Sequence, residues 1–371
     1  MKTSQFLWTP AAGWSTPAPA LPDADLVLAF ADAEHFRSAK CFEELKALFP
    51  TAHIVGCSSS GSVYDTHLDD GDIVATAIRF ERGTVKMAVS DMQPGENVEG
   101  LATGLMEKLR ADDLRHVFVL SDGLNVNGSD LAKGFNSIGI AVTGGLAGDG
   151  TRFAKTWVMA DAPAQAGRVV ALGFYGDLTV KSGCFAGWQE FGAERVVTKS
   201  TANVVYEIDG QPALALYKKY LGDLAADLPG SGLRFPLSVQ ADKNAKSIIR
   251  TLLAVDEDAQ SLTFAGDVPQ GYICKLMKTN LDNLIDSAGM AAAAAKPGDA
   301  GAAGLCLVVS CVGRRLVLGQ LVEEELEIVR ENLGKKTALT GFYSYGELAP
   351  FSDILQCQLH NQTMTLTTIY E

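Results

Sequence analysis

Between residues 26 and 150, short apolar runs alternate with stretches in which apolar residues recur every three or four positions. The first pattern is typical of buried strands and the second of amphipathic helices. Together they predict strands over residues 26–31, 53–57, 73–80, 85–91, 117–121 and 140–143, and helices over 36–49, over 98–109 and after Ser129. This part of the chain therefore mixes both kinds of element.

The pattern then becomes richer in strands before it returns to a mixture. It predicts an antiparallel group over residues 169–175, 178–185, 194–199 and 204–208, followed by a helix that begins near Pro212. Farther along, it predicts strands over 247–255, 261–264, 305–311, 337–345 and 354–369, and helices over 280–290 and 323–332. This order predicts an α/β or α+β fold in which helices pack on mixed sheets.

Two interruptions of the pattern predict the domain organisation. Residues 1–23 contain four prolines and no periodicity, which predicts an extended arm laid on the surface. Residues 222–234 are polar and rich in Gly and Pro, which predicts a boundary. We therefore expect two mixed-sheet domains, 24–222 and 223–371, that meet near residues 222–236.

The last predicted strand changes its buried face partway along. Leu355, Cys357 and Leu359 occupy odd positions, whereas Met364 and Leu366 occupy even ones. A period-two strand changes parity only through a bulge or a break. The sequence therefore predicts an interruption across residues 360–363. His360 is then either a structural histidine bonded to a carboxylate such as Glu347, or a ligand or metal contact.

Composition and charge exclude several classes of protein. The 371 residues are 47% apolar and 20% charged, which is typical of a soluble globular protein and not of a disordered or fibrous one. The net charge of −13, without any run of more than two basic residues, disfavours nucleic acid and anionic membranes as partners. A strongly anionic ligand would need local arginines to overcome this overall charge.

The sequence carries no targeting signal that we recognise. Its longest uncharged apolar run, residues 300–313, is too short to cross a membrane. The first residues lack the continuous apolar segment of a signal peptide. We therefore expect a cytoplasmic protein whose seven cysteines, an odd number without CxxC spacing, are reduced thiols.

Four predicted strand ends share glycines and small polar residues, namely residues 56–61, 144–150, 310–315 and 341–347. Such segments allow backbone N–H groups to approach a ligand, although each one alone is also typical of a tight turn. Four of them together favour a shared ligand pocket. Its candidate residues are Cys57, Ser58, Gly144, Gly145, Asp149, Cys311, Tyr343 and Glu347.

Enzyme motifs are incomplete. The segment from Gly56 to Ser60 matches four of the five positions of a G-x-S-x-G nucleophile elbow. The glycines at 145–150 follow the wrong order for a dinucleotide site, and no P-loop or paired-histidine zinc motif is present. A hydrolase that uses Cys57 or Ser58 stays open as an alternative, and it would need a nearby histidine as base.

The ordered set of motifs resembles the FIST family over roughly residues 25–370. Segments similar to the N-terminal FIST domain are Gly56-Cys57-Ser58, Ser121-Asp122-Gly123-Leu124, residues 144–150, Val197-Thr198 and residues 209–213. Segments similar to the C-terminal FIST domain are residues 311–314, 341–347 and 360–363. Each motif is loose, and the order of the whole set carries the specificity.

The resemblance implies an intracellular sensory module that binds a small ligand such as an amino acid. Many members are fused to output domains, and this chain has none, so its signal would pass in trans. One bacterial subset consists of haem-containing nitric-oxide sensors that act on a histidine kinase. For this alternative, His360 is our first choice of haem ligand. The partners would be the small ligand and a kinase or other signalling protein, with a homodimer as a further option.

We therefore predict a sensor that binds its ligand between or beside the two halves and does not catalyse a reaction. Arg314 or Arg315 would clamp a ligand carboxylate, because a guanidinium matches a carboxylate in a fork geometry. The alternative for this pair is a surface salt bridge to Glu323–Glu325. Glu347 would hold an amino group or orient His360, and Tyr343 and Tyr345 would form an aromatic wall. Asn361 completes the candidate site.

Overall fold

The computed structural model describes residues 1–15, 20–93, 95–298, 304–351 and 354–371. Its strands form three six-stranded sheets and one eight-stranded sheet. Helices pack on these sheets, so the predicted α+β class with mixed sheets is confirmed. None of the helices in these ranges has the length and apolar character needed to cross a membrane.

The first sheet has the order β11-β4-β3-β7-β1-β2. Its strands are β1 (Lys2–Thr9), β2 (Gly13–Trp14), β3 (Leu26–Ala31), β4 (His53–Ser58), β7 (Ile73–Arg79) and β11 (Val158–Ala160). A short 3-10 turn (Ala33–Phe36) and helix α1 (Lys40–Leu48) cover it, with Cys41 and Leu45 buried. Residues 2–9 were expected in a surface arm, whereas they pair along β7, and prolines 17 and 19 lie outside the described residues.

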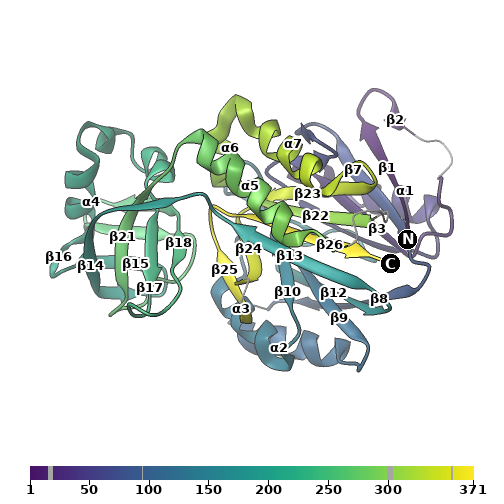
Figure 1. Cartoon of the computed structure of the whole chain (residues 1–371), viewed down its shortest axis with the longest axis horizontal. Helices are drawn as coiled ribbons and strands as arrows, with labels where there is room; N and C mark the ends of the chain where they lie inside the picture. The colour runs from purple at the N-terminus through teal and green to yellow at the C-terminus, as the bar shows by residue number, and fades with distance from the viewer. Residues whose placement is uncertain (16–19, 94, 299–303, 352–353) are drawn as a thin grey trace.

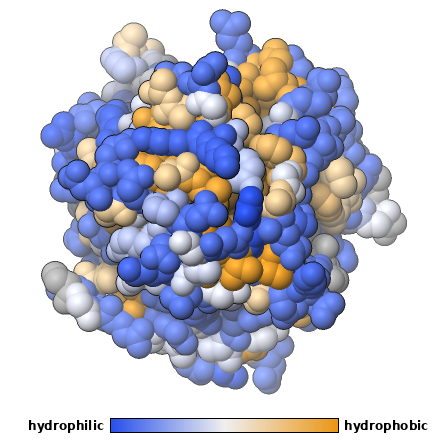
Figure 2. Space-filling view, turned by 90° about the vertical axis from the view of Figure 1, so that its left-hand side faces the viewer, coloured by the Kyte–Doolittle hydropathy of each residue, from blue (hydrophilic) through white to orange (hydrophobic). Residues whose placement is uncertain are grey.

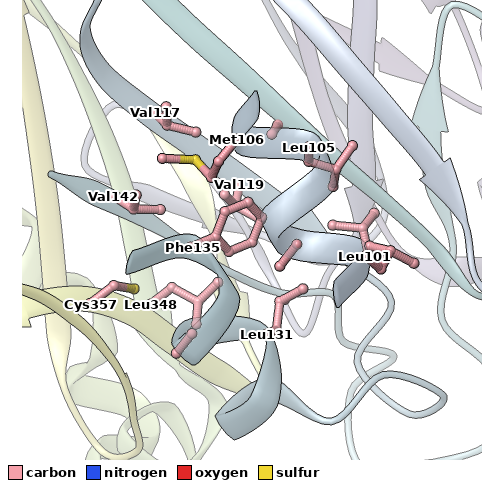
Figure 3. Close-up of a cluster of buried hydrophobic side chains, with 14 of the residues drawn as sticks. Leu101, Leu105, Met106, Val117, Val119, Leu131, Phe135, Val142, Leu348 and Cys357 are labelled. Atoms are coloured by element: carbon pink, nitrogen blue, oxygen red, sulfur yellow. The ribbon is translucent and has the colours of Figure 1, made fainter. Parts of the chain in front are cut away.

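The second sheet has the order β25-β24-β10-β9-β12-β8. Its strands are β8 (Gly83–Asp91), β9 (Leu114–Ser121), β10 (Val142–Leu146), β12 (Arg168–Gly176), β24 (Gly346–Phe351) and β25 (Ile354–His360). Helices α2 (Val98–Leu109) and α3 (Gly128–Phe135) cover one face. Leu101, Leu105 and Phe135 point from these helices onto Val117 and Val119 of the sheet (Figure 3).

The third sheet has the order β13-β26-β22-β23-β5-β6. Its strands are β5 (Ser62–Tyr64), β6 (His67–Asp69), β13 (Thr179–Phe185), β22 (Gly304–Cys311), β23 (Thr337–Ser344) and β26 (Met364–Tyr370). Helices α5 (Leu281–Ala295), α6 (Val312–Leu318) and α7 (Val322–Leu333) accompany it. One buried cluster joins the three sheets, and in it Phe30 stacks on Phe342 with ring centroids 5.0 Å apart. We call the three joined sheets and their helices the body.

The fourth sheet stands apart from the body (Figure 1). It contains β14 (Gln189–Thr201), β15 (Val204–Ile208), β16 (Gln211–Pro212), β17 (Leu237–Gln240), β18 (Ile248–Arg250), β19 (Leu252–Asp256), β20 (Ser261–Phe264) and β21 (Ile273–Lys278). Helix α4 (Ala213–Leu221) and two 3-10 turns (Gly222–Asp227 and Gly230–Arg234) close its core. We call residues 189–278 the lobe. Figure 2 views the molecule from this end, where hydrophilic residues surround a few apolar patches.

The sheets do not divide the chain at residue 222. Strands β24 and β25, from the C-terminal part, extend the sheet that contains β9 and β10. Strands β5, β6 and β13, from the N-terminal part, belong to the sheet built on β22 and β23. The lobe includes residues on both sides of 222. In space, the chain therefore separates into a discontinuous body and a continuous lobe.

The interruption expected near the C-terminus is confirmed. Strand β25 ends at His360 and β26 begins at Met364, with Gln362 in the left-handed region at φ 61°. The two strands belong to different sheets, which explains why the buried face changes parity between them. A second predicted strand, 247–255, is also divided, because Thr251 separates β18 from β19.

Candidate functional site

A cavity of about 500 Å³ lies between the body and the lobe. The body contributes the segment from Gly123 to Gly128 after β9 and the segment from Cys311 to Gly313 at the start of α6. The lobe contributes the segment from Thr251 to Leu253 and the segment from Phe264 to Asp267. Further lining residues are Leu146, Thr151, Phe153, Asn203, Pro229, Gly230, Leu233, Leu316, Tyr345 and Leu359. A volume of this size is within the range of cavities that hold small organic ligands.

A buried carboxylate shapes the body loop that lines the cavity. Asp122 is fully buried and accepts the backbone N–H groups of Leu124 and Asn125, each at 2.8 Å. Its other oxygen accepts the N–H of Gly167 at 2.6 Å. Hydrogen bonds of this kind hold a loop in one conformation, because they satisfy N–H groups that no strand or helix uses. The loop therefore presents a fixed wall to the cavity.

Glycine is required at the start of this loop. A Cβ atom at Gly123 would lie 1.9 Å from the carbonyl oxygen of Ala147. The loop after β9 and the loop after β10 approach each other this closely because β9 and β10 are parallel neighbours in the sheet. At the far end of the loop, Asn127 caps α3 by accepting the N–H groups of Ser129 and Asp130.

Two stacked aromatic rings form another wall. The ring of Phe153 stacks on Tyr345 with centroids 4.7 Å apart. The Tyr345 hydroxyl donates to Asp149, which also accepts the N–H groups of Phe153 and Ala154, each at 2.9 Å. Burial raises the pKa of Asp149, but hydrogen bonds from Tyr345 and from backbone N–H groups outweigh it, so this pKa lies below its usual value. Asp149 is therefore a charged anchor for the wall.

The lobe contacts the body through Arg250 and the cavity through Thr251. The Arg250 guanidinium donates to the carbonyl of Asp267 at 2.9 Å and, across to the body, to the carbonyl of Leu359 at 3.0 Å. Burial lowers the pKa of Arg250 to about 10, which still leaves it charged at neutral pH. Thr251 lines the cavity and is 4% exposed, and its hydroxyl oxygen is buried within the protein without a hydrogen-bond partner.

The mouth of the cavity is apolar. Leu124, Phe153, Leu253 and Leu316 all line it, and they are 39%, 46%, 40% and 40% exposed. These side chains come from four separate segments, two of which flank parallel strands of the second sheet. A cluster of exposed large apolar residues around one opening is typical of a binding site.

The four glycine-rich strand ends do lie close together. Their backbone N–H groups, however, mainly donate hydrogen bonds to carbonyl groups of the neighbouring strand ends rather than facing a ligand. The N–H of Ser60 donates to the carbonyl of Tyr343 at 2.8 Å, and that of Gly148 donates to the carbonyl of Ser58 at 3.0 Å. The N–H of Tyr345 donates to the carbonyl of Leu146 at 3.0 Å. These donors are therefore used within the fold, and of the four ends only parts of the last three line the cavity.

Arg314 is an internal residue and does not reach the cavity. Its guanidinium and the carboxylate of Glu325 are both fully buried, and Nη2 lies 2.7 Å from Oε2. Its remaining donors bond to Ser287 and to the carbonyls of Ala186 and Leu284. The other Glu325 oxygen accepts the hydroxyl of Tyr343 at 2.6 Å. The expected carboxylate clamp at Arg314 and the aromatic wall at Tyr343 are thus replaced by an ion pair with Glu325, which the sequence-based alternative placed on the surface and the structure places in the core.

Arg315 lies on a second hollow of about 500 Å³ beside the cavity. Its Nη2 atom is 2.6 Å from Asp70, and its Nη1 atom donates to the carbonyl of Ser60. Arg152 on the same hollow is likewise paired, 2.6 Å from Asp32. Asp149 lines this hollow too. Each arginine here already has an acidic partner.

The residues expected for nucleophilic catalysis are also internal. Cys57 is fully buried, and burial raises the pKa of its thiol well above the usual value. The Ser58 hydroxyl accepts the N–H of Trp157 at 3.0 Å, and the nearby His53 pairs with Asp161 at 2.6 Å. Gly144 and Gly145 lie inside β10, where a Cβ at Gly144 would meet the carbonyl of Val119 at 2.0 Å. This set contains no exposed nucleophile with a histidine beside it.

Glu347, His360 and Asn361 lie behind the cavity wall. Glu347 accepts hydrogen bonds from Ser344 at 2.5 Å and from the Thr363 hydroxyl at 2.8 Å. Burial raises its pKa to about 7. His360 pairs across the ladder with Glu347, but its Nε2 lies 3.1 Å from the carbonyl oxygen of Ala349. Asn361 is buried, and its side-chain oxygen has no partner.

The residues present do not fit a haem held by His360. Because Nε2 faces a carbonyl oxygen, it carries the proton and is not available as an iron ligand. Burial lowers the pKa of this imidazole to about 4, and the ring packs edge-to-face on Phe351. The lining of the cavity, as far as the structure describes the chain, includes no histidine. Within the same described residues, no cluster of His, Cys, Asp and Glu is arranged to hold a metal ion.

Several lining residues were not predicted from the sequence. Thr251 and Leu253 lie within the strand predicted over 247–255, and Asp267 follows the strand predicted over 261–264. The segment from Gly123 to Gly128, Gly-Leu-Asn-Val-Asn-Gly, did carry a signal, because it follows a strand and has the same glycine-rich character as the four segments chosen. Three residues of the segment 310–315 were chosen, Cys311, Arg314 and Arg315, and of these three Cys311 lines the cavity.

Comparison with known proteins identifies the kind of protein that this architecture represents. A model of the FIST N domain matches residues 25–211, and a model of the FIST C domain matches residues 213–350. The chain therefore belongs to the FIST family. FIST domains are linked to sensory signal transduction and to the binding of small ligands. The two models meet close to the boundary expected at residue 222, although the body draws strands from both.

Other comparisons add little about function. No curated protein sequence matches the chain. A solved chorismatase is 10% identical, with a TM-score of 0.33, and the match covers 100% of this chain and 98% of that one. A cyanuric acid hydrolase is 10% identical, with a TM-score of 0.35, and the match covers 100% and 99% of the two chains. Likeness at this level supports neither activity in this chain.

Proposed function

We propose that the chain is a non-enzymatic sensor that binds a small molecule in the cavity between the body and the lobe. The observation that carries the proposal is the composition of this cavity: its walls come from both parts of the molecule, and it has an apolar mouth. Membership of a sensory family supports the same function.

The connection between the two parts suggests how occupancy would be transmitted. Only two segments join the lobe to the body, residues 186–188 before β14 and residues 279–280 after β21. Across the cavity, Arg250 donates to the carbonyl of Leu359, and Gln362 donates to the carbonyl of Leu233 at 3.2 Å. A ligand that contacts both walls stabilises one arrangement of lobe and body relative to others. That shift would be the signal.

The partner that receives the signal belongs to the proposal as well. In this proposal the two FIST domains pass the signal in trans to a histidine kinase or another signalling protein in the cytoplasm. A homodimer is compatible with this scheme. The clamp of a ligand carboxylate by Arg314 is not part of the proposal, since that side chain is fully engaged inside the body.

The test compares ligand binding by the wild-type chain with ligand binding by a variant that carries a charge at the mouth of the cavity. Native mass spectrometry of the purified protein reveals a retained molecule, and a thermal-shift screen of small metabolites reveals others. Leu253→Glu places a carboxylate on the lining and should abolish the retained mass and the thermal shifts. Leu355→Glu is the matched control, because Leu355 is 64% exposed and lies outside the lining. Ligands that bind both variants equally would contradict the proposed site.

A further inference from the structure

We infer that the cavity is a site for an organic cation, whose protonated amine lies beside the carboxylate of Asp267 and whose apolar body lies against the mouth. This inference rests on the proposed function and goes further, because it names the chemical class of the ligand. It departs from the expectation of an amino acid or organic acid, both of which carry a carboxylate. Three features support it: the charge of the lining, the charge of the walls behind it and the conformation of Phe153.

Asp267 gives the lining its charge. Among the lining residues that the structure describes, it is the one charged side chain, and it is partly exposed. In the described part of the chain its carboxylate takes part in no ion pair and accepts one long hydrogen bond, from the side-chain amide of Asn127 at 3.4 Å. Most of its capacity to accept hydrogen bonds is therefore unused. An ammonium group in the cavity would supply both the missing donors and the opposite charge.

Two cations of the protein act on Asp267 electrostatically, and both have other partners. Burial lowers the pKa of Arg250, and the charge of Asp267 opposes this change. The Arg250 guanidinium nevertheless donates to backbone carbonyl groups and not to the carboxylate. The pKa of Lys133 is raised by its hydrogen bond to Asp130, 2.7 Å away, and less strongly by Asp267. Neither cation lines the cavity, so Asp267 presents the charge that a ligand contacts.

The walls behind the lining add more negative than positive charge. In the described structure, the hydrogen bonds that Asp122 accepts behind the body loop all come from neutral groups. Asp149, behind the aromatic wall, keeps its charge, because hydrogen bonds outweigh the effect of burial on its pKa. Arg152 and Arg315 lie on the second hollow, where each is paired with an aspartate. Nearly all of the net charge of −13 also belongs to the body, because acidic and basic residues are almost balanced in the lobe. The potential in the cavity therefore favours a cation over an anion.

Phe153 supplies an aromatic surface for the body of the ligand. Its backbone is in the left-handed region at φ 49°, which bulky residues rarely adopt. Asp149 holds this conformation by accepting the N–H groups of Phe153 and Ala154. The ring stacks on Tyr345, and 46% of Phe153 stays exposed at the mouth. Strained residues of this kind concentrate at binding sites, so a ligand contact gives this conformation a purpose that the core does not.

Three dansylamide probes with one skeleton separate charge from apolar contact. The same alkyl chain extends from the sulfonamide nitrogen and ends in an ammonium in dansylcadaverine, a methyl in N-hexyldansylamide and a carboxylate in 6-(dansylamino)hexanoate. Fluorescence titration of the whole chain at neutral pH and low ionic strength gives a Kd for each. We expect the ammonium probe to bind at least about tenfold more tightly than the carboxylate probe. Both charged groups are costly to remove from water, and only the ammonium gains a partner of opposite charge.

Substitutions at Asp267 locate the charged contact. Asp267→Asn keeps the size of the side chain and an acceptor for Asn127, and it removes the charge. It should weaken the ammonium probe about tenfold, strengthen the carboxylate probe about threefold, and change N-hexyldansylamide less than about twofold. Asp267→Glu retains the charge and should retain the preference for the ammonium. Asp177→Asn is the control, because this side chain is 77% exposed and lies outside the lining, and it should change no affinity by more than about twofold.

The outcomes separate the class of ligand from the site. Phe153→Ala should weaken all three probes alike, because they share the apolar body, and it tests the site without changing any charge. If it does so, equal or tighter binding of the carboxylate probe overturns the inference and leaves the proposed site standing. So does an Asp267→Asn variant in which the three affinities change alike or not at all. If no probe binds, or if Phe153→Ala changes none of the affinities, the proposed function itself fails. Leu253→Glu does not serve here, because it removes apolar contact and adds a carboxylate at the same time.

Discussion

At the scale of single residues, the most informative side chain is Arg314, because it looked like a ligand clamp and is instead part of the core. It and Glu325 are both fully buried, with hydrogen bonds on all sides. Burying two charges costs desolvation energy that good geometry only just offsets. The pair therefore ties α6, α7 and α5 together without contributing to recognition.

Removing one member of this pair should be far more harmful than removing an exposed arginine. Arg314→Met leaves Glu325 buried without its cation, which should lower the free energy of unfolding by about 3–5 kcal/mol. Arg315→Ala, which breaks a partly exposed pair with Asp70, should cost no more than about 1 kcal/mol. Urea denaturation measures both. Partial recovery in the double variant Arg314→Met, Glu325→Gln would confirm the pairing, and equal losses in the two single variants would contradict it.

Glu347 should make the stability of the protein depend on pH. Burial raises the pKa of this carboxyl from 4.5 to about 7 in the folded state, while hydrogen bonds from Ser344 and Thr363 oppose the rise. Folding favours the neutral form of this carboxyl. Its contribution to the free energy of unfolding is therefore fully present below pH 4.5 and is lost as the pH rises through 7.

The effect is measured by comparing the wild-type chain with Glu347→Gln. The loss between pH 4.5 and pH 8 should be on the order of 3 kcal/mol in the wild-type chain and absent in the variant. Urea denaturation at pH 5, 6, 7 and 8 gives the two curves. Parallel curves would show that Glu347 keeps its ordinary pKa.

Residue-level chemistry was only partly predictable from the sequence. The motif that contains His360 and Asn361 marks a real break, but their side chains serve the fold, since the His360 ring bonds to Ala349. The sequence did not single out Thr251 as a lining residue, because one threonine within a predicted strand is common. It lines the cavity because the lobe and the body meet there, which depends on residues far away in the chain.

At the scale of elements, the sequence predicted most of the long strands and helices of the body and missed β1, β24, α6 and the short strands β5, β6 and β11. The apolar spacing over 98–109 gave α2, with Leu101, Leu105 and Leu109 buried. The change of buried face near His360 correctly predicted the turn between β25 and β26. The prediction failed at residues 1–23, because period-two alternation is weak in β1, where only Phe6 is fully buried.

Close contact between loops predicts the effect of a single methyl group at Gly123. Gly123→Ala places a Cβ against the carbonyl of Ala147, which should displace the loop after β9, lower the thermal midpoint and weaken ligand binding at the cavity. Gly104→Ala is the control, because nothing lies within 4 Å of a Cβ there and Gly104 is within α2. It should stabilise the protein by about 0.5–1 kcal/mol. Differential scanning fluorimetry ranks the two, and a wild-type midpoint in Gly123→Ala would contradict the close approach.

At the scale of the molecule, the division into body and lobe was not predictable from the sequence. The pairings that build the body join strands far apart in the chain, such as β5 with β23 and β10 with β24. Local patterns predict that a strand exists and do not specify its partner. The polar segment after residue 222 marks 3-10 turns within the lobe and so lies away from the connection between the two parts.

Arg250 connects the two parts and should control how firmly the lobe is held. Arg250→Met keeps the apolar stem and removes the hydrogen bonds to the carbonyls of Asp267 and Leu359. Hydrogen exchange should then become faster in β18 and β19 and stay unchanged in β22 at the centre of the body. Mass spectrometry of exchanged peptides measures this, and equal acceleration in both regions would indicate global destabilisation instead.

The two segments that join lobe and body run side by side. Gln189 pairs with Lys278, and the Thr279 hydroxyl donates to the carbonyl of Gly187 at 2.7 Å. The lobe is thus a continuous insertion whose ends nearly touch, so the body core can persist while the inserted segment is exchanged or reshaped. In an evolving lineage, one half of the binding wall can then diversify rapidly while the other half stays fixed. A family with this architecture can acquire new ligand specificities by replacing the lobe, without changing the fold of the body.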